Sequence, residues 1–193
     1  MKRLLTFVLL LGTLLLSGCF LQAHKPLMDK AERITPLPDH FAAYMLEDDT
    51  GEVTKSDDGE PSLFVGERLE SNLYRYELVS GDKDDIGDQN YVAFYAFPTL
   101  PDGILIEMME QEDKDEVAYF AGRINADGLK YYMMNVSDQL QAEADRQGID
   151  LKDDYVGSKK DLLAYISLWL KDESSAHFRS NSNEGASVMH ILK

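Results

Sequence analysis

The chain has 193 residues, 44% of them hydrophobic, and its 19 Lys and Arg against 35 Asp and Glu give a formal net charge of −16. This composition suits one globular domain, two at most, and excludes collagen-like, coiled-coil and wholly disordered chains. Because binding to phosphates needs clustered Lys and Arg, we do not expect a nucleic-acid-binding protein. A single cysteine excludes an intramolecular disulfide framework and a zinc site built from cysteines.

The N-terminus has the pattern of a secretory signal. Two basic residues, Lys2 and Arg3, precede a 13-residue run from Leu4 to Leu16 that is mainly apolar. A helix of that length is too short to cross a bilayer stably. The run ends at Leu16-Ser17-Gly18-Cys19. The small residues leave the backbone open to a peptidase, and the thiol is a nucleophile that can take a diacylglyceryl group.

These four residues resemble the lipobox of bacterial lipoproteins, and all four positions match. The resemblance implies that residues 1–18 are a signal peptide and that Cys19 carries acyl chains such as palmitate, enough for stable anchoring. Phe20 stands where Asp usually retains a Gram-negative lipoprotein in the inner membrane, which implies the periplasmic face of the outer membrane. The alternative is an ordinary cleaved signal that happens to end near a cysteine.

Residues 19–38 are expected to form the lipidated cysteine and a tether. They contain three prolines and little periodicity, and residues 20–38 carry three basic and two acidic side chains. As a flexible coil they would reach about 20–25 Å on average. Residues 39–193, with 14 basic and 33 acidic side chains, are expected to form a single acidic, β-rich periplasmic domain.

Alternation of apolar and polar residues predicts seven strands, separated by clusters of acids and glycines. The predicted strands are 40–46, 62–66, 73–79, 91–98, 103–110, 116–124 and 129–135. Because the connections are short, the strands are expected to pair as an antiparallel meander.

The C-terminal third carries the helical signals. Ser158 and Asp161 have the spacing of a capping box before a helix over 158–171, whose apolar face includes Leu162, Ile166 and Trp169. A more polar helix is expected to end near Gln147. Residues 174–186 are expected to be a loop, and 187–192 a closing edge strand.

Two predicted strands, 91–97 and 104–109, are apolar on both faces, so both faces must be covered. The fold class is therefore α+β and mainly antiparallel β. We expect a curled sheet or a small barrel-like roll of about seven to eight strands, with the C-terminal helix packed on it.

No motif for a catalytic nucleophile or a phosphate-binding loop is present, so we expect neither an enzyme nor a cofactor. The four histidines are expected to have surface or packing roles, with no metal site. The acidic segment 82–88 matches only part of the EF-hand pattern. Its acids are expected to be solvated, and a weak calcium site is the alternative.

Glu107 lies in a strand expected to be buried, where a carboxylate needs a partner such as Arg75 or Arg123. It is a candidate polar anchor in a pocket. The other candidate ligand-binding residues are three aromatic residues of the strand region, Tyr95, Tyr119 and Tyr132. For the aromatic residues of this region the first expectation is packing in the core, and a ligand groove or a partner interface is the alternative. The alternative is a strand end where Glu107 reaches water.

We therefore expect a non-catalytic interaction or accessory module of the cell envelope, whose partners are the membrane, through Cys19, and an envelope protein with a basic surface. The alternative is a binder of a small apolar or sugar ligand inside the curled sheet. A packed interior would favour the first, and an open cavity holding Glu107 would favour the second.

Overall fold

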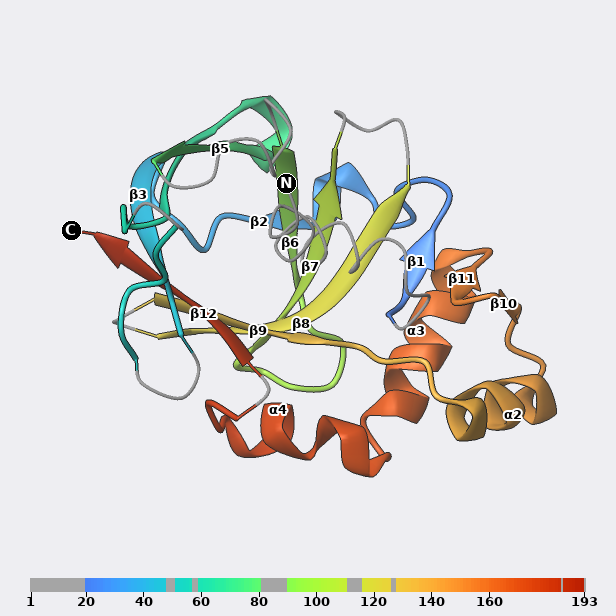
Figure 1. The fold of residues 1–193 in the computed structure, drawn as a ribbon. Coiled ribbons are helices and arrows are strands. Elements are labelled where there is room, and N and C mark those ends of the chain that lie inside the picture. The colour runs from blue at the N-terminus through green and yellow to red at the C-terminus, as the bar shows by residue number, and fades with distance from the viewer. Residues whose placement is uncertain are drawn as a thin grey trace, which may run out of the picture.

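A closed antiparallel barrel of eight strands forms the body of the protein (Figure 1). The computed structural model describes residues 20–47, 51–56, 59–80, 90–110, 116–125, 128–184 and 186–192. Around the barrel the strands follow one another as β8-β7-β6-β5-β4-β3-β12-β9, and β9 pairs with β8 again. These strands are β3 (His40–Leu46), β4 (Leu63–Arg68), β5 (Tyr74–Ser80), β6 (Asn90–Ala96), β7 (Gly103–Met109), β8 (Val117–Asn125), β9 (Gly128–Met133) and β12 (Ala186–Leu192).

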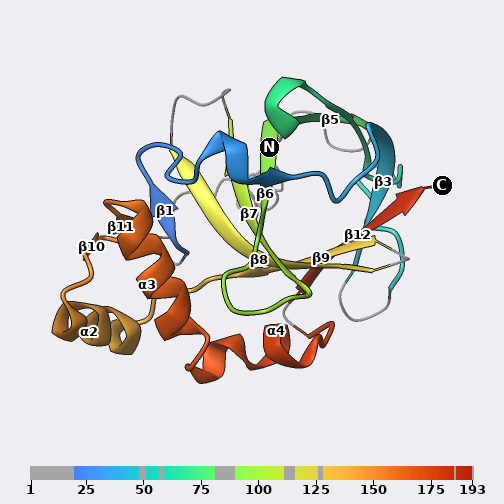
Figure 2. The same cartoon turned by 180° about the vertical axis from the view of Figure 1, so that it is seen from behind.

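In the described part of the chain, short strands and three helices are added to the barrel, and Figure 2 shows α2 and α3 on the side that also carries β1. The added strands are β1 (Gln22–Ala23), β2 (Arg33–Ile34), β10 (Leu151–Lys152) and β11 (Tyr155–Val156). The helices are α2 (Asp138–Gln147), α3 (Lys159–Trp169) and α4 (Ala176–Ser180), and short 3-10 turns lie at Lys30–Glu32, Glu70–Asn72 and Glu173–Ser175.

The seven strands predicted from the alternation are confirmed, with ends that shift by at most two residues. They pair in sequence order as an antiparallel meander. The expected fold class, a curled and barrel-like β structure with a packed C-terminal helix, is also confirmed.

Two apolar clusters explain why the central strands are apolar on both faces. The inner cluster fills the barrel with side chains such as Tyr74, Phe94 and Phe120. The outer cluster lies between the outer face of β6–β8 and the helices, and includes Leu105 and Trp169. Successive residues of a strand point to opposite faces, so each central strand contributes to both clusters.

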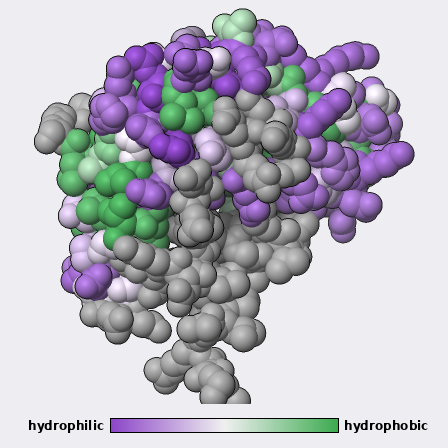
Figure 3. All heavy atoms as spheres, turned by 90° about the horizontal axis from the view of Figure 1, so that it is seen from above, coloured by the Kyte–Doolittle hydropathy of each residue, from purple (hydrophilic) through white to green (hydrophobic). Residues whose placement is uncertain are grey.

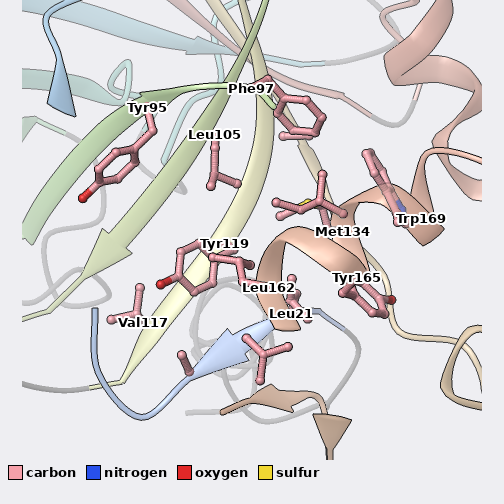
Figure 4. Packing of buried hydrophobic residues seen from close by; sticks show 14 of the residues in the cluster. Leu21, Tyr95, Phe97, Leu105, Val117, Tyr119, Met134, Leu162, Tyr165 and Trp169 are labelled. Atoms are coloured by element: carbon pink, nitrogen blue, oxygen red, sulfur yellow. The ribbon is translucent and has the colours of Figure 1, made fainter. Parts of the chain in front are cut away.

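Helix α3 begins where the capping pattern predicts, because the Ser158 side chain accepts a hydrogen bond from the Asp161 backbone N–H. Figure 4 shows its side chains facing the strands. Leu162, Tyr165 and Trp169 are fully buried there, and the ring of Trp169 lies 5.6 Å from that of Phe178 in α4.

The prediction that residues 20–38 form a flexible tether is wrong. Phe20 is 1% exposed, and Leu21 and Ala23 are completely buried. β1 pairs with β8 and β11, and β2 pairs with β6. The prolines of this segment interrupt regular structure, but its apolar side chains still gain more by packing on the barrel than by exposure to water.

Two predictions for the C-terminal region are also wrong. Residues 174–186 are not simply a loop, because they contain α4, whose Phe178 is buried between Phe97, Tyr132 and Trp169. β12 is not an edge strand. It pairs with β3 on one side and β9 on the other, and so closes the barrel.

Candidate functional site

Glu107 lies at the centre of β7 with no exposed surface. Its cross-strand neighbours are Ala93 of β6 and Tyr119 of β8, and its side chain belongs to the outer face of the barrel. Residues 27–33 cover it there, since hydrogen bonds from this segment reach the group around Glu107. Glu107 is therefore enclosed between the barrel wall and the N-terminal segment.

Two tyrosines hold the Glu107 carboxylate. Tyr95 donates its hydroxyl hydrogen to Oε1 at 2.9 Å, and Tyr119 donates to Oε2 at 3.0 Å. Figure 4 shows both tyrosines projecting from the strands. The Met28 backbone N–H also favours the charged form of the carboxylate. We call Glu107, Tyr95 and Tyr119, with Arg33, the Glu107 network.

The same tyrosines bind the N-terminal segment. The Tyr119 hydroxyl accepts a hydrogen bond from the Leu27 backbone N–H at 3.0 Å. Arg33 donates from Nε to the Tyr95 hydroxyl at 3.3 Å and from Nη1 to the Ser71 carbonyl at 3.5 Å. Each side chain of the network therefore has protein partners, as a buried polar group requires.

Burial raises the pKa of Glu107 above its ordinary value, although the two tyrosine hydroxyls, the Met28 N–H and the positive charge of Arg33 act in the opposite direction. The pKa values of Tyr95 and Tyr119 are raised by burial and by the neighbouring Glu107 carboxylate. Both hydroxyls therefore stay protonated and remain donors to Glu107.

Three of the four candidate ligand-binding residues thus meet, but the fourth does not. The Tyr132 hydroxyl donates to the Ser182 carbonyl, and its ring lies 5.4 Å from Phe178. The Glu107 carboxylate is held by protein donors, and Glu107 does not reach water. The Glu107 network therefore acts as a clamp: its hydrogen bonds fasten residues 27–33 to the barrel.

Neither expected cation lies beside Glu107. Arg75 forms an ion pair with Glu67, and Arg123 donates to the Phe178 carbonyl at 3.1 Å. The cation is Arg33, which is 5% exposed. Sequence reasoning missed it because Arg33 lies in a segment that was expected to be flexible.

A groove of about 640 Å³ lies on another part of the barrel, over the outer face of β3–β5. It is lined by His40, Phe41, Ala42, Val65, Gly66, Glu67, Arg75, Tyr76, Glu77 and Leu192. Ala42, Val65 and Glu77 form one cross-strand row, and His40, Glu67 and Arg75 form the next. In Figure 3 hydrophobic surface gathers on the side of the molecule where β3 lies in Figure 1.

The groove combines apolar and acidic groups. Val65 and Ala42 are half-buried, Leu192 is 38% exposed, and Glu77 is exposed. Glu67 is ion-paired with Arg75 across the strands, so Glu77 adds one net negative charge. A Cβ at Gly66 would come 2.3 Å from the Phe41 ring, which packs beneath it.

Within the described ranges, no group of three or more His, Cys, Asp or Glu side chains could hold a metal ion. His177 and His190 do not form a site together: His177 faces Glu184 at 3.5 Å, and His190 pairs within the sheet. The acidic segment 82–88 and Cys19 lie outside the described residues. No helix in the described part of the chain is long and apolar enough to cross a membrane.

Comparison with known proteins gives no family. No protein-family model matches the chain, and no curated protein or solved structure is significantly similar to it. The function is therefore inferred from the residues and geometry of this chain alone.

Proposed function

We propose that the protein is a lipoprotein of the bacterial cell envelope, anchored through Cys19 on the periplasmic face of the outer membrane, and that its barrel binds a partner protein without catalysis. The lipobox supports the anchor. The groove over β3–β5 supports the binding role, and it is the observation that carries the proposal.

The groove fits an extended, basic segment of a partner protein. Its apolar row can pack against aliphatic side chains, while Glu77 and the net charge of −16 attract Lys and Arg. The outer face of β6–β8 is already covered by α3 and the N-terminal segment. The sheet face over β3–β5 keeps exposed or half-exposed groups such as Val65, Glu77 and Leu192.

The alternative of a small ligand inside the sheet has less support. Side chains of the inner cluster fill the barrel, among them Phe94, Ile106 and Phe120. The Glu107 network is occupied by protein donors. Packed groups of this kind favour a rigid scaffold that presents a surface.

The anchor is tested by metabolic labelling with a radioactive fatty acid. The full chain is expected to incorporate label, and Cys19→Ala is expected to incorporate none and to accumulate as an unprocessed or soluble product. Continued labelling of Cys19→Ala would overturn the anchor.

The groove is tested with a fluorescent peptide in which Lys alternates with Val, and binding is followed by fluorescence polarisation. We expect saturable binding that weakens with added salt and is lost in Glu77→Lys. Asp102→Lys makes the same charge change at an exposed position outside the groove, and it should bind as wild type does. Equal losses in the two variants would mean that only net charge matters.

A further inference from the structure

The position of Phe20 limits how far the domain can move from its anchor. The Phe20 ring stacks on Phe120 with centroids 5.9 Å apart, and Phe20 forms a β-bridge with Asn135. The next residue donates its backbone N–H to the Met134 carbonyl at 3.1 Å. The residue that follows Cys19 in the sequence is therefore already packed in the domain.

Covalent geometry converts this packing into a distance. Consecutive Cα atoms lie about 3.8 Å apart, so Cys19 is within a few ångströms of the buried Phe20. Each headgroup layer of a bilayer is only about 5–8 Å thick. Acyl chains attached at Cys19 would thus hold the barrel at the headgroups, whereas a free 19-residue tether would allow about 20–25 Å.

The topology of the barrel determines which of its sides lies next to the anchored cysteine. β1 pairs with β8, and β8 lies four strands from β4 in both directions around the closed barrel. The groove lies over β4. In Figures 1 and 2, β1 and the C-terminal end of β12 lie on opposite sides of the molecule.

From these observations we infer that the lipidated domain lies directly against the bilayer with its β1–β8 side, and presents the β3–β5 groove to the periplasm. This orientation rests on the lipid anchor proposed above. The bilayer that the domain contacts is the one that holds the anchor. The contacting surface of the protein includes Met133, which is 40% exposed beside the Phe20–Phe120 pair. A basic partner then reaches the groove from the periplasm without meeting the membrane.

Two exposed apolar residues provide a matched pair of probes. Met133 is 40% exposed, and Leu192 in the groove is 38% exposed. Since Tyr132 pairs with Ala186, Leu192 lies roughly 20 Å further along β12. Lipidation blocks the only natural thiol, so a cysteine at either position can be labelled alone.

The experiment uses full-length lipidated protein in vesicles of phosphatidylethanolamine and phosphatidylglycerol that contain headgroup-nitroxide lipid. Met133→Cys and Leu192→Cys each carry the same fluorophore. We expect the label at 133 to be quenched at least about twofold more than the label at 192. Roughly twenty Gly and Ser residues inserted between Cys19 and Phe20 should remove this difference, because they restore a flexible tether.

Fatty-acid labelling of the same samples separates the two proposals. No incorporated label would overturn the anchor itself. Incorporated label with equal quenching at the two positions, before any linker is inserted, would overturn the orientation and leave the anchor standing. A difference that persists with the inserted linker would also count against the orientation, because close attachment would then not be its cause.

Discussion

Tyr119 and Glu107 face each other across β8 and β7, and the tyrosine hydroxyl donates to the carboxylate at 3.0 Å. The same hydroxyl accepts a hydrogen bond from the Leu27 backbone. One side chain therefore joins the barrel wall to the segment that crosses it. This contact, together with Arg33 on Tyr95, explains why residues 20–38 are ordered although their composition is typical of a linker.

Tyr119→Phe removes both of these hydrogen bonds. Glu107 loses one of its donors and the Leu27 N–H loses its acceptor, so the free energy of unfolding should fall by about 1.5–3 kcal/mol. Denaturant titration measures the change. Tyr44→Phe removes a hydroxyl from a half-buried position on the outer face of β3 and should change stability far less. Equal effects in the two variants would argue against the clamp.

The pH dependence of stability should depend on Glu107. Because burial raises its pKa, the folded chain binds this proton more tightly than the unfolded chain does. The stabilisation is therefore full below the ordinary value of 4.5 and is lost as the pH rises through the folded-state pKa. Glu107→Gln cannot titrate there. The stability of wild type relative to Glu107→Gln should decline above pH 4.5, and a relative stability that rises would mean that Arg33 and the hydroxyls lower the pKa.

Trp169 should be needed for packing but not for its polar atom. Trp169→Ala removes the largest buried side chain from between α3 and α4 and should cost about 3–5 kcal/mol. The buried indole N–H has no hydrogen-bond partner among the described residues. Trp169→Phe removes this unsatisfied donor and keeps an aromatic ring, so it should cost clearly less than Trp169→Ala in thermal unfolding. Equal losses in the two variants would contradict this prediction, because the phenyl ring would then recover none of the packing that the indole supplies.

Closure of the barrel should be sensitive to Gly128. A Cβ at this position would lie 2.1 Å from the Met189 carbonyl oxygen, so Gly128→Ala would force β9 away from β12. We expect a loss of about 1–3 kcal/mol or more. Gly148→Ala is the control, because Gly148 also has a positive φ but nothing lies within 4 Å of a Cβ there. Gly148→Ala should cost about 1 kcal/mol. A Gly128→Ala variant as stable as the Gly148→Ala control would contradict the close approach of β9 and β12.

Local patterns in the sequence were sufficient for the strands and for the main helix. Alternation sets which strand residues point inward, and β3 has the bounds that the alternation predicted. Ser158 and Asp161 begin α3 through a hydrogen bond between residues three apart. The apolar character of both faces of β6 and β7 also predicted that two layers would cover these strands. Each of these features depends on neighbours within a few residues.

The tertiary structure decided what depends on pairs distant in sequence. β12 closes the barrel because it pairs with β3, more than a hundred residues earlier, and with β9. Arg33 approaches Glu107 only because β2 pairs with β6, and the groove exists only where β3, β4 and β5 lie side by side. The free energy of such contacts comes from burial and long-range hydrogen bonding. The periodic pattern of apolar residues marks which face of a strand or helix is buried, but it does not say which distant segment covers that face. The lipobox could be recognised from four adjacent residues, whereas the packing of Phe20 beside it required the complete fold.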